Sequence, residues 1–113
     1  MQRSIKNVIV SDFAKEDLHE IIAYYQSLSQ KYVDKTISAF ENNIISLKSF
    51  PKKGRIIPEL QQQGIENYRE IIQDYYRIIY EINNDEVYIH AVIDGRRNFE
   101  DIIISKIMRR YSR

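Results

Sequence analysis

Arginines flank a predicted β-hairpin in the second half of the chain, and their side chains suit the binding of anions. Arg77 lies within the first predicted strand, residues 76–82, while Arg96 and Arg97 follow a glycine just after the second, residues 86–93. A guanidinium stays protonated, and its planar fork matches the oxygens of a phosphate or carboxylate. Two adjacent arginines that leave the sheet together gain nothing for packing, and an exposed ion pair there contributes under about 1 kcal/mol. We therefore expect Arg96 and Arg97 to bind an anionic partner.

Other cations have structural interpretations that stay open beside functional ones. Arg77 could form a cross-strand ion pair with Glu70 or Glu86. The cations of residues 52–55 suit a solvated loop, although Arg55 remains a candidate contact to a target. Aromatic side chains between cations can stack on nucleic-acid bases, but the nine tyrosines favour positions at the core edge and the sheet surface.

Proton transfer would need a group such as histidine, and the chain has two histidines. His90 lies in mid-strand, in phase with Tyr88 and Val92, where an imidazole more often packs than reacts. His19 falls on the polar side of the first predicted helix. The sequence has no cysteine, no glycine-rich phosphate loop and no metal-ligand spacing, so we expect neither a metal nor a cofactor.

Length and composition set limits on the class of protein. The chain has 113 residues, of which 43% are apolar and 29% charged, with a formal net charge of +1. This length fits a single domain, residues 1–113, with one modest core. Anion binding must come from local clusters, because the chain is not a polycation. No apolar run approaches the ~20 residues of a membrane span, and the N-terminus does not resemble a signal peptide. We expect a cytoplasmic protein with no membrane partner.

Hydrophobic periodicity predicts the secondary structure. Apolar residues recur at helical spacing over residues 14–28 and 33–47, and the second helix must end near Phe50 because Pro51 cannot continue it. Asn and Asp between the later strands tolerate the left-handed backbone of tight turns. The predicted order is a strand over residues 5–10, helices over 14–28 and 33–47, an irregular segment over 52–64, strands over 67–72, 76–82 and 86–93, and a helix over 99–111.

This order predicts an α+β fold with an N-terminal strand, a helical hairpin on one face of a mostly antiparallel sheet, and a C-terminal helix. We expect four strands, with the other face and at least one edge of the sheet open. An open edge accepts an extended peptide by strand addition, and a groove beside a helix accepts an amphipathic helix. Arg69 and Arg77 could face the same side of adjacent strands, which is a hypothesis about register.

Three short segments carry a family resemblance. They are Arg69-Glu70, the run Tyr76-Arg77-Ile78-Ile79-Tyr80 and the run Val92-Ile93-Asp94-Gly95-Arg96-Arg97. Together with the SDFAKEDL opening of the first helix and the break over residues 50–59, they resemble the RelE/ParE superfamily of toxins from bacterial type II toxin–antitoxin modules. The resemblance covers nearly the whole chain, and its specificity lies in the ordered set.

The resemblance implies a small cytoplasmic toxin that a cognate antitoxin neutralises. RelE-like members cleave messenger RNA in the ribosomal decoding site, whereas ParE-like members inhibit DNA gyrase and are not nucleases. The long helical hairpin and the segment from Gly54 to Glu59 look more like ParE. The chain has Asp94 where the family often has a histidine, Ile71 where RelE-like nucleases have a basic residue, and Ile102 where they tend to have an aromatic residue or histidine.

Three functions follow as hypotheses. The first is a ParE-like toxin that inhibits an essential target, with DNA gyrase favoured. The second is a RelE-like ribosome-dependent ribonuclease, in which the resemblance makes Arg69, Arg77 and Arg97 catalytic because they would stabilise negative charge on the reacting phosphate. The third is a non-toxic homologue that acts as a binding partner. A cognate antitoxin in a hetero-oligomer is the expected partner, and the candidate contacts to a target or nucleic acid are Arg55, Arg69, Arg77, Arg96 and Arg97.

Overall fold

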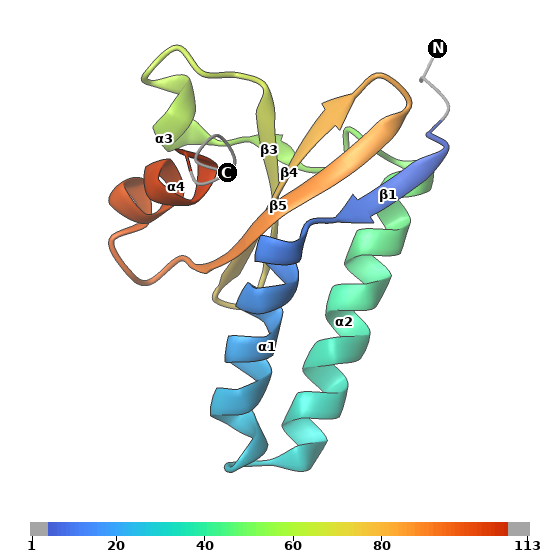
Figure 1. Ribbon diagram of the computed structural model, residues 1–113, viewed down its shortest axis with the longest axis vertical. Coiled ribbons are helices and arrows are strands. Elements are labelled where there is room, and N and C mark those ends of the chain that lie inside the picture. The colour runs from blue at the N-terminus through green and yellow to red at the C-terminus, as the bar shows by residue number, and fades with distance from the viewer. Residues whose placement is uncertain (1–4, 109–113) are drawn as a thin grey trace.

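A sheet with helices on both faces forms the molecule (Figure 1). The computed structural model describes residues 5–108, so the predicted end of the last helix, residues 109–111, lies outside the described part. In chain order the elements are β1 (Asn7–Val10), α1 (Asp12–Gln26), α2 (Gln30–Ser49), β2 (Arg55–Ile56), α3 (Pro58–Gln61), β3 (Tyr68–Gln73), β4 (Tyr76–Asn83), β5 (Glu86–Asp94) and α4 (Phe99–Met108).

The strands follow the order β1-β5-β4-β3-β2 across one sheet. β1 pairs in parallel with β5, and the other neighbours are antiparallel. Asp74 and Asn84 adopt positive φ angles of 52° and 57° in the turns on either side of β4, as expected for these residue types. The α+β fold and the mostly antiparallel sheet are therefore confirmed.

Residues 52–64, which we predicted to be irregular, contain β2 and the short helix α3. The sheet therefore has five strands. Pro58 begins α3, a position for which its fixed φ is suited. Ile57 and Leu60 are 0% and 1% exposed, so this segment contributes to a core. The prediction of four strands and an irregular segment is wrong, because a two-residue strand and a one-turn helix carry no periodicity and depend on pairing and burial.

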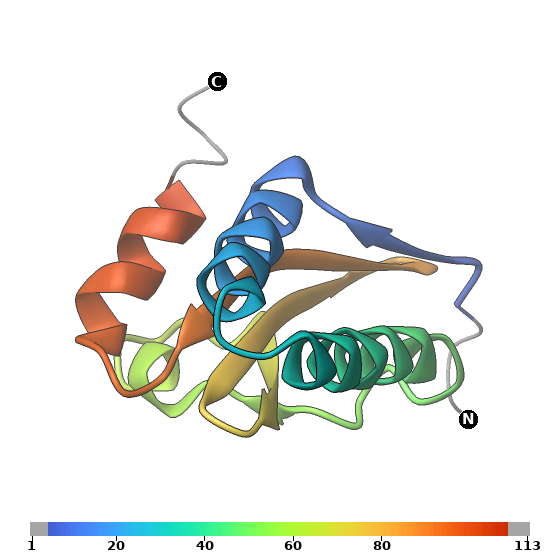
Figure 2. The same ribbon diagram turned by 90° about the horizontal axis from the view of Figure 1, so that it is seen from below.

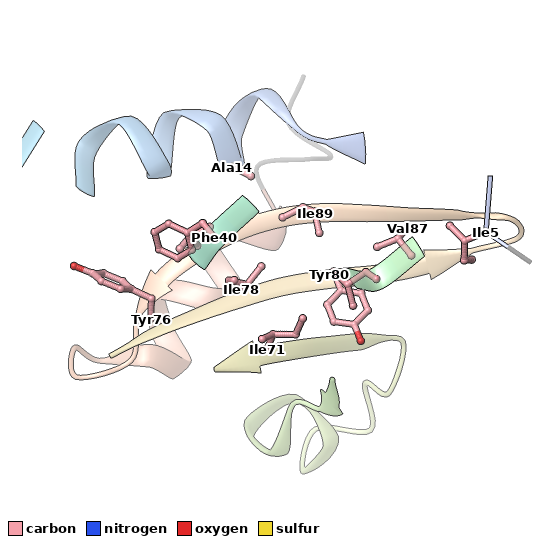
Figure 3. Packing of buried hydrophobic residues seen from close by; sticks show 11 residues of the cluster. Ile5, Ala14, Phe40, Ile71, Tyr76, Ile78, Tyr80, Val87 and Ile89 are labelled. Carbon is pink, nitrogen blue, oxygen red and sulfur yellow. The ribbon is translucent and has the colours of Figure 1, made fainter. Parts of the chain in front are cut away.

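The helical hairpin of α1 and α2 covers one face of the sheet, as predicted. Ala14 of α1 and Phe40 of α2 belong to the larger core cluster together with Ile78 of β4 and Ile89 of β5 (Figure 3). Serine side chains cap the N-termini of both helices. Ser11 accepts a hydrogen bond from the backbone N–H of Ala14 in α1, and Ser29 accepts one from that of Tyr32 in α2. The loop end of the hairpin extends beyond the ends of the strands (Figure 1).

The opposite face of the sheet is covered by α3 and α4, so the prediction that it stays open is wrong. Figure 2 shows the strands between α3 and α4 on the left and α2 on the right. Phe99 and Ile103 of α4 pack with Ile79 and Ile93 of the sheet in a second core cluster. The reason is composition, because α4 presents apolar side chains that must be removed from water. Within residues 5–108, no helix has the length and apolar character needed to cross a membrane.

A buried carboxylate also joins α4 to the rest of the fold. Asp17 of α1 is 5% exposed, and it accepts a hydrogen bond from the backbone N–H of Val92 at 3.0 Å and one from the ammonium of Lys106 at 2.5 Å. These contacts connect α1, β5 and α4 through one side chain. Hydrogen bonds to charged groups in buried positions contribute about 1.5–3 kcal/mol each, so α4 is held by polar as well as apolar contacts.

Candidate interaction site

Arg77 is buried inside the sheet layer rather than presented to a partner. Its guanidinium donates to both carboxylate oxygens of Glu70, at 2.5 and 2.8 Å, and to both of Glu59, at 2.8 and 2.9 Å. Its guanidinium carbon lies 3.4 Å from the centre of the Phe99 ring. Of the two structural alternatives from the sequence, the ion pair forms with Glu70, and Glu59 of α3 completes it.

The carboxylates around Arg77 change its pKa, and its side chain also packs closely against the backbone at Gly95. Burial alone would lower the pKa of Arg77, but the hydrogen bonds that it donates to Glu59 and Glu70 outweigh burial and raise the pKa above its ordinary value. The hydrogen bond from Arg77 lowers the pKa of Glu59. A Cβ at Gly95 would lie 2.9 Å from Cδ of Arg77. A side chain at the glycine before the arginine pair would therefore crowd the Arg77 side chain.

Arg69 and Arg77 lie on opposite faces of the sheet, so the hypothesis that they face the same side is wrong. Arg69 is opposite Tyr80 in the pairing of β3 with β4, whereas Arg77 is opposite Ile72. Side chains directly opposite each other share a face, so Arg69 lies on the face of Tyr80. Arg77 is three residues from Tyr80 on the same strand, and side chains alternate along a strand, so Arg77 lies on the other face. Arg69 donates instead to the backbone carbonyl of Gly54 at 2.8 Å.

Arg55 is more exposed than these two arginines, but it is also paired. Its Nε donates to Oε2 of Glu70 at 2.8 Å, and 56% of its side chain is exposed. Glu70, which is 1% exposed, therefore binds two arginines, and its Oε2 accepts a hydrogen bond from each. The segment that resembles the family at residues 54–59 thus contributes to an internal ion-pair network. We name Arg55, Glu59, Glu70 and Arg77 the buried network.

Arg96 is exposed but fixed in orientation. Its Nε and Nη2 donate to the two carboxylate oxygens of Asp94 at 3.0 and 2.9 Å, and its guanidinium carbon lies 4.1 Å from the centre of the Tyr75 ring. The hydrogen bonds that Arg96 donates to Asp94 lower the pKa of Asp94 and raise the pKa of Arg96. The expectation that this arginine gains nothing from packing is therefore wrong, because it stacks on an aromatic ring.

Arg97, the next residue, is exposed, and among residues 5–108 its guanidinium has no ion-pair partner. It lies at the edge of a surface groove with a volume of about 400 Å³. This volume is within the range of sites that bind small ligands or side chains. We name this hollow the Tyr–Arg groove, which is lined by Glu20, Ile21, Tyr24, Tyr25, Leu28, Tyr76, Asp94, Arg96 and Arg97.

The wall of the Tyr–Arg groove opposite the arginines is aromatic and apolar. Tyr24 and Leu28 are each 67% exposed near the loop end of the hairpin. The hydroxyl of Tyr76 donates to that of Tyr25 at 3.2 Å, and burial, followed by this hydrogen bond, raises the pKa of Tyr76. Large apolar side chains in solvent beside a free cation are typical of a contact surface.

Sequence reasoning missed the aromatic half of this groove. The helical spacing placed Leu28 on the buried face of the first helix, but it lies in solvent because the hairpin extends beyond the sheet. The tyrosine pairs at residues 24–25 and 75–76 were the available signal. In each pair one ring is exposed and the other partly or fully buried, and only the packed fold brings the two pairs together.

His90 is packed, as the strand position suggested, and 7% exposed. Its Nε2 lies 3.0 Å from Oε1 of Glu81, and its ring packs against Tyr68 and Tyr88. His19 is exposed on α1. No group of three or more histidine or carboxylate side chains converges as a metal site within residues 5–108.

Comparison with known proteins identifies the family. The model of the ParE toxin family of type II toxin–antitoxin systems (parDE) matches residues 8–99. This match covers most of the chain, from β1 to the first residue of α4. The chain therefore belongs to the ParE toxin family.

A solved structure has the same fold. It is described as the chromosomal ParDE toxin–antitoxin system from P. aeruginosa, and it superimposes with a TM-score of 0.65. The match covers 82% of this chain and 98% of that chain, at 13% sequence identity. No curated protein matches the chain. The structural similarity supports the fold, and the specific partners of this chain have to be argued from its own surface.

Proposed function

We propose that the chain is a cytoplasmic toxin of a type II toxin–antitoxin module that inhibits DNA gyrase and is neutralised by a cognate antitoxin. The observation that carries this proposal is the unpaired Arg97 beside the exposed Tyr24 and Leu28, in a chain of the ParE toxin family. Arginine and tyrosine are enriched among residues that dominate protein–protein binding. The Tyr–Arg groove is then the surface that meets the target, and an antitoxin that covers it prevents inhibition.

The positions of the arginines support binding rather than RNA cleavage. A ribonuclease site needs its cations within reach of one phosphate, together with groups that transfer protons. Arg77 is enclosed by Glu59 and Glu70, Arg69 binds a backbone carbonyl on the other face, and Arg97 lies at the groove. A binding function needs only the last of these to be accessible.

Growth and supercoiling assays test the proposal together. We expect expression of the chain alone to stop bacterial growth, and the purified protein to inhibit supercoiling by gyrase while translation continues. Arg97→Glu removes the free cation and should abolish both effects. Lys52→Glu is the matched control, because it makes the same change of charge at another exposed residue. Lys52 follows the far end of α2, about 30 Å along the helix from the hairpin loop.

Each alternative has its own outcome in these assays. Cleavage of messenger RNA in a translating extract, without an effect on gyrase, would replace the proposal with a RelE-like ribonuclease. Unimpaired growth during expression would favour a non-toxic homologue. Restored growth on co-expression of a neighbouring gene that encodes a DNA-binding module with an acidic tail would support the antitoxin part of the proposal.

A further inference from the structure

We infer that the Tyr–Arg groove recognises a protein segment in which an apolar side chain lies next to a carboxylate. The apolar side chain would enter the hollow between α1 and the end of β4, and the carboxylate would pair with Arg97. This inference rests on the proposed function only in treating the groove as the working surface. It adds the chemistry of the segment that binds there.

The two arginines at the groove have different tasks. Arg96 already makes two hydrogen bonds with Asp94 and stacks on Tyr75, so its charge is compensated and its plane forms a fixed wall. Arg97 forms no ion pair among the described residues, although its charge helps to lower the pKa of Asp94. A single carboxylate satisfies Arg97 through two parallel hydrogen bonds. The groove therefore has one vacant position for an anion, although it contains two arginines.

The opposite wall selects an apolar neighbour for that carboxylate. Tyr24 and Leu28 expose two thirds of their surface, at 67% each, and Ile21, one turn before Tyr24 on α1, lines the same hollow. Burial of such surface contributes about 25 cal/mol per Å² removed from water. Because the rings of Tyr24 and Tyr25 pack edge to face, with centroids 4.9 Å apart, the wall is ordered before binding.

The charges around the groove favour a protein segment over a nucleic acid. Glu20 and Asp94 also line the hollow, so its formal charge is balanced by two carboxylates and two guanidiniums. A phosphate backbone brings repeated negative charges and depends on a positive field along its path. Glu20 would repel those phosphates, whereas one carboxylate beside an apolar group needs only Arg97.

A small probe tests this chemistry on the full chain. 3-Phenylpropionate carries a phenyl ring and one carboxylate, and 3-phenylpropylamine reverses only the charge. We expect 3-phenylpropionate to shift the amide NMR signals of Tyr24, Leu28 and Arg97, and the amine to leave them in place. Arg97→Glu should weaken probe binding by about fivefold or more, while Lys52→Glu leaves it unchanged. Leu28→Ala should weaken binding too, while Ile45→Ala, at an equally exposed residue of α2, should not.

Several results would overturn the inference. It fails if the two probes shift the signals equally, if the shifts map to other residues, or if a short oligothymidylate shifts the groove signals when 3-phenylpropionate does not. Growth and gyrase assays on the same variants separate this inference from the proposed function. Probe binding without toxicity would remove the function and keep the groove, and toxicity without probe binding would do the reverse.

Discussion

The buried network and the Tyr–Arg groove both contain arginines from the segments that resemble the family, yet the two regions have opposite environments. In the buried network, 11% of the Arg77 side chain and 0% of the Glu70 side chain are exposed, and two carboxylates enclose one guanidinium. At the groove, Arg97 lies in solvent without an ion-pair partner among residues 5–108. The first arrangement holds elements together, and the second leaves a charge available.

The difference teaches that a motif residue must be judged by its surroundings. Arg77 links β4 to β3, α3 and α4 through Glu70, Glu59 and Phe99, so changing it perturbs every element on that face. Arg97 forms no ion pair with any other element within residues 5–108. Loss of function in an Arg77 variant would therefore not identify a catalytic residue, whereas loss of function in a folded Arg97 variant would identify a contact.

The largest effect that distinguishes the regions is expected for Arg77→Met. This change leaves the carboxylate of Glu70 buried with only Arg55 beside it, and breaking a buried ion pair costs about 3–5 kcal/mol. We expect the midpoint of urea unfolding to fall strongly, with toxicity lost through unfolding. A double variant that also carries Glu70→Leu should recover part of this stability, because no buried charge then lacks its partner. An unchanged midpoint in the single variant would show that the network does not stabilise the fold.

A smaller loss of stability is expected when a methyl group is added to the backbone beside the network. A Cβ at Gly54 would lie 2.5 Å from the carbonyl oxygen of Glu70 and 2.7 Å from the Tyr80 ring, whereas one at Gly95 would lie 2.9 Å from Cδ of Arg77 and 3.3 Å from the carbonyl oxygen of Tyr75. Backbone and a buried ring cannot move aside as a side chain can, so Gly54→Ala should cost about 2–3 kcal/mol and Gly95→Ala about 1–2.

Gly64→Ala is the control for this series. No atom lies within 4 Å of a Cβ there, but its φ of +78° is strained for alanine, which costs about 1 kcal/mol. Thermal unfolding of the three variants should therefore rank Gly54→Ala below Gly95→Ala and Gly95→Ala below Gly64→Ala. Equal losses at all three positions would contradict the close contacts of Gly54 and Gly95.

Much of the fold was predictable because its elements have strong local patterns. Helical periodicity located α1 and α2, and Pro51 located the end of the second helix. β2 and α3 were not predictable, because a two-residue strand depends on its pairing with β3. The sequence also did not predict that α3 and α4 cover the second face of the sheet, because the position of α4 depends on contacts between residues that are far apart in the sequence.

The candidate site was predictable only in part, because a turn decides which face an arginine takes. Gln73 pairs with Tyr76, so two residues form the turn and Arg69 and Arg77 lie on opposite faces. If the turn instead comprised three residues, 74–76, Arg77 would pair with Gln73 and would lie on the same face as Arg69. The partners of Arg77 could not be foreseen either, since Glu59 reaches it from a helix eighteen residues away in sequence.

A pH series sharpens the comparison further, with an effect smaller than that of the substitutions above. The hydrogen bond from Arg77 lowers the pKa of Glu59 below its ordinary value of 4.5. A carboxyl group with a lowered pKa stabilises the folded state above its unfolded pKa, and this contribution is lost as the pH falls through the folded value. Glu59→Gln should therefore reduce the free energy of unfolding at pH 7, and the difference should vanish in acid.

The matched control for the pH series is Glu66→Gln. Glu66 is exposed and forms no ion pair among residues 5–108, so its removal should change the free energy of unfolding by less than about 0.5 kcal/mol at any pH. Urea unfolding at a series of pH values measures both variants. A difference between wild type and Glu59→Gln that stayed constant down to strong acid would mean that the Glu59 charge does not stabilise the network.

The smallest effect on stability is expected at the groove. Neither Arg96→Ala nor Arg97→Ala should shift the midpoint of urea unfolding measurably, because both side chains are exposed and the partners of Arg96 within residues 5–108 are Asp94 and neighbouring tyrosines. Inhibition of growth should nevertheless be lost in Arg97→Ala, because the vacant anion position disappears. A fully folded Arg97→Ala protein that still stops growth would show that accessibility does not make this arginine a contact, and the contrast between the two regions would then concern stability alone.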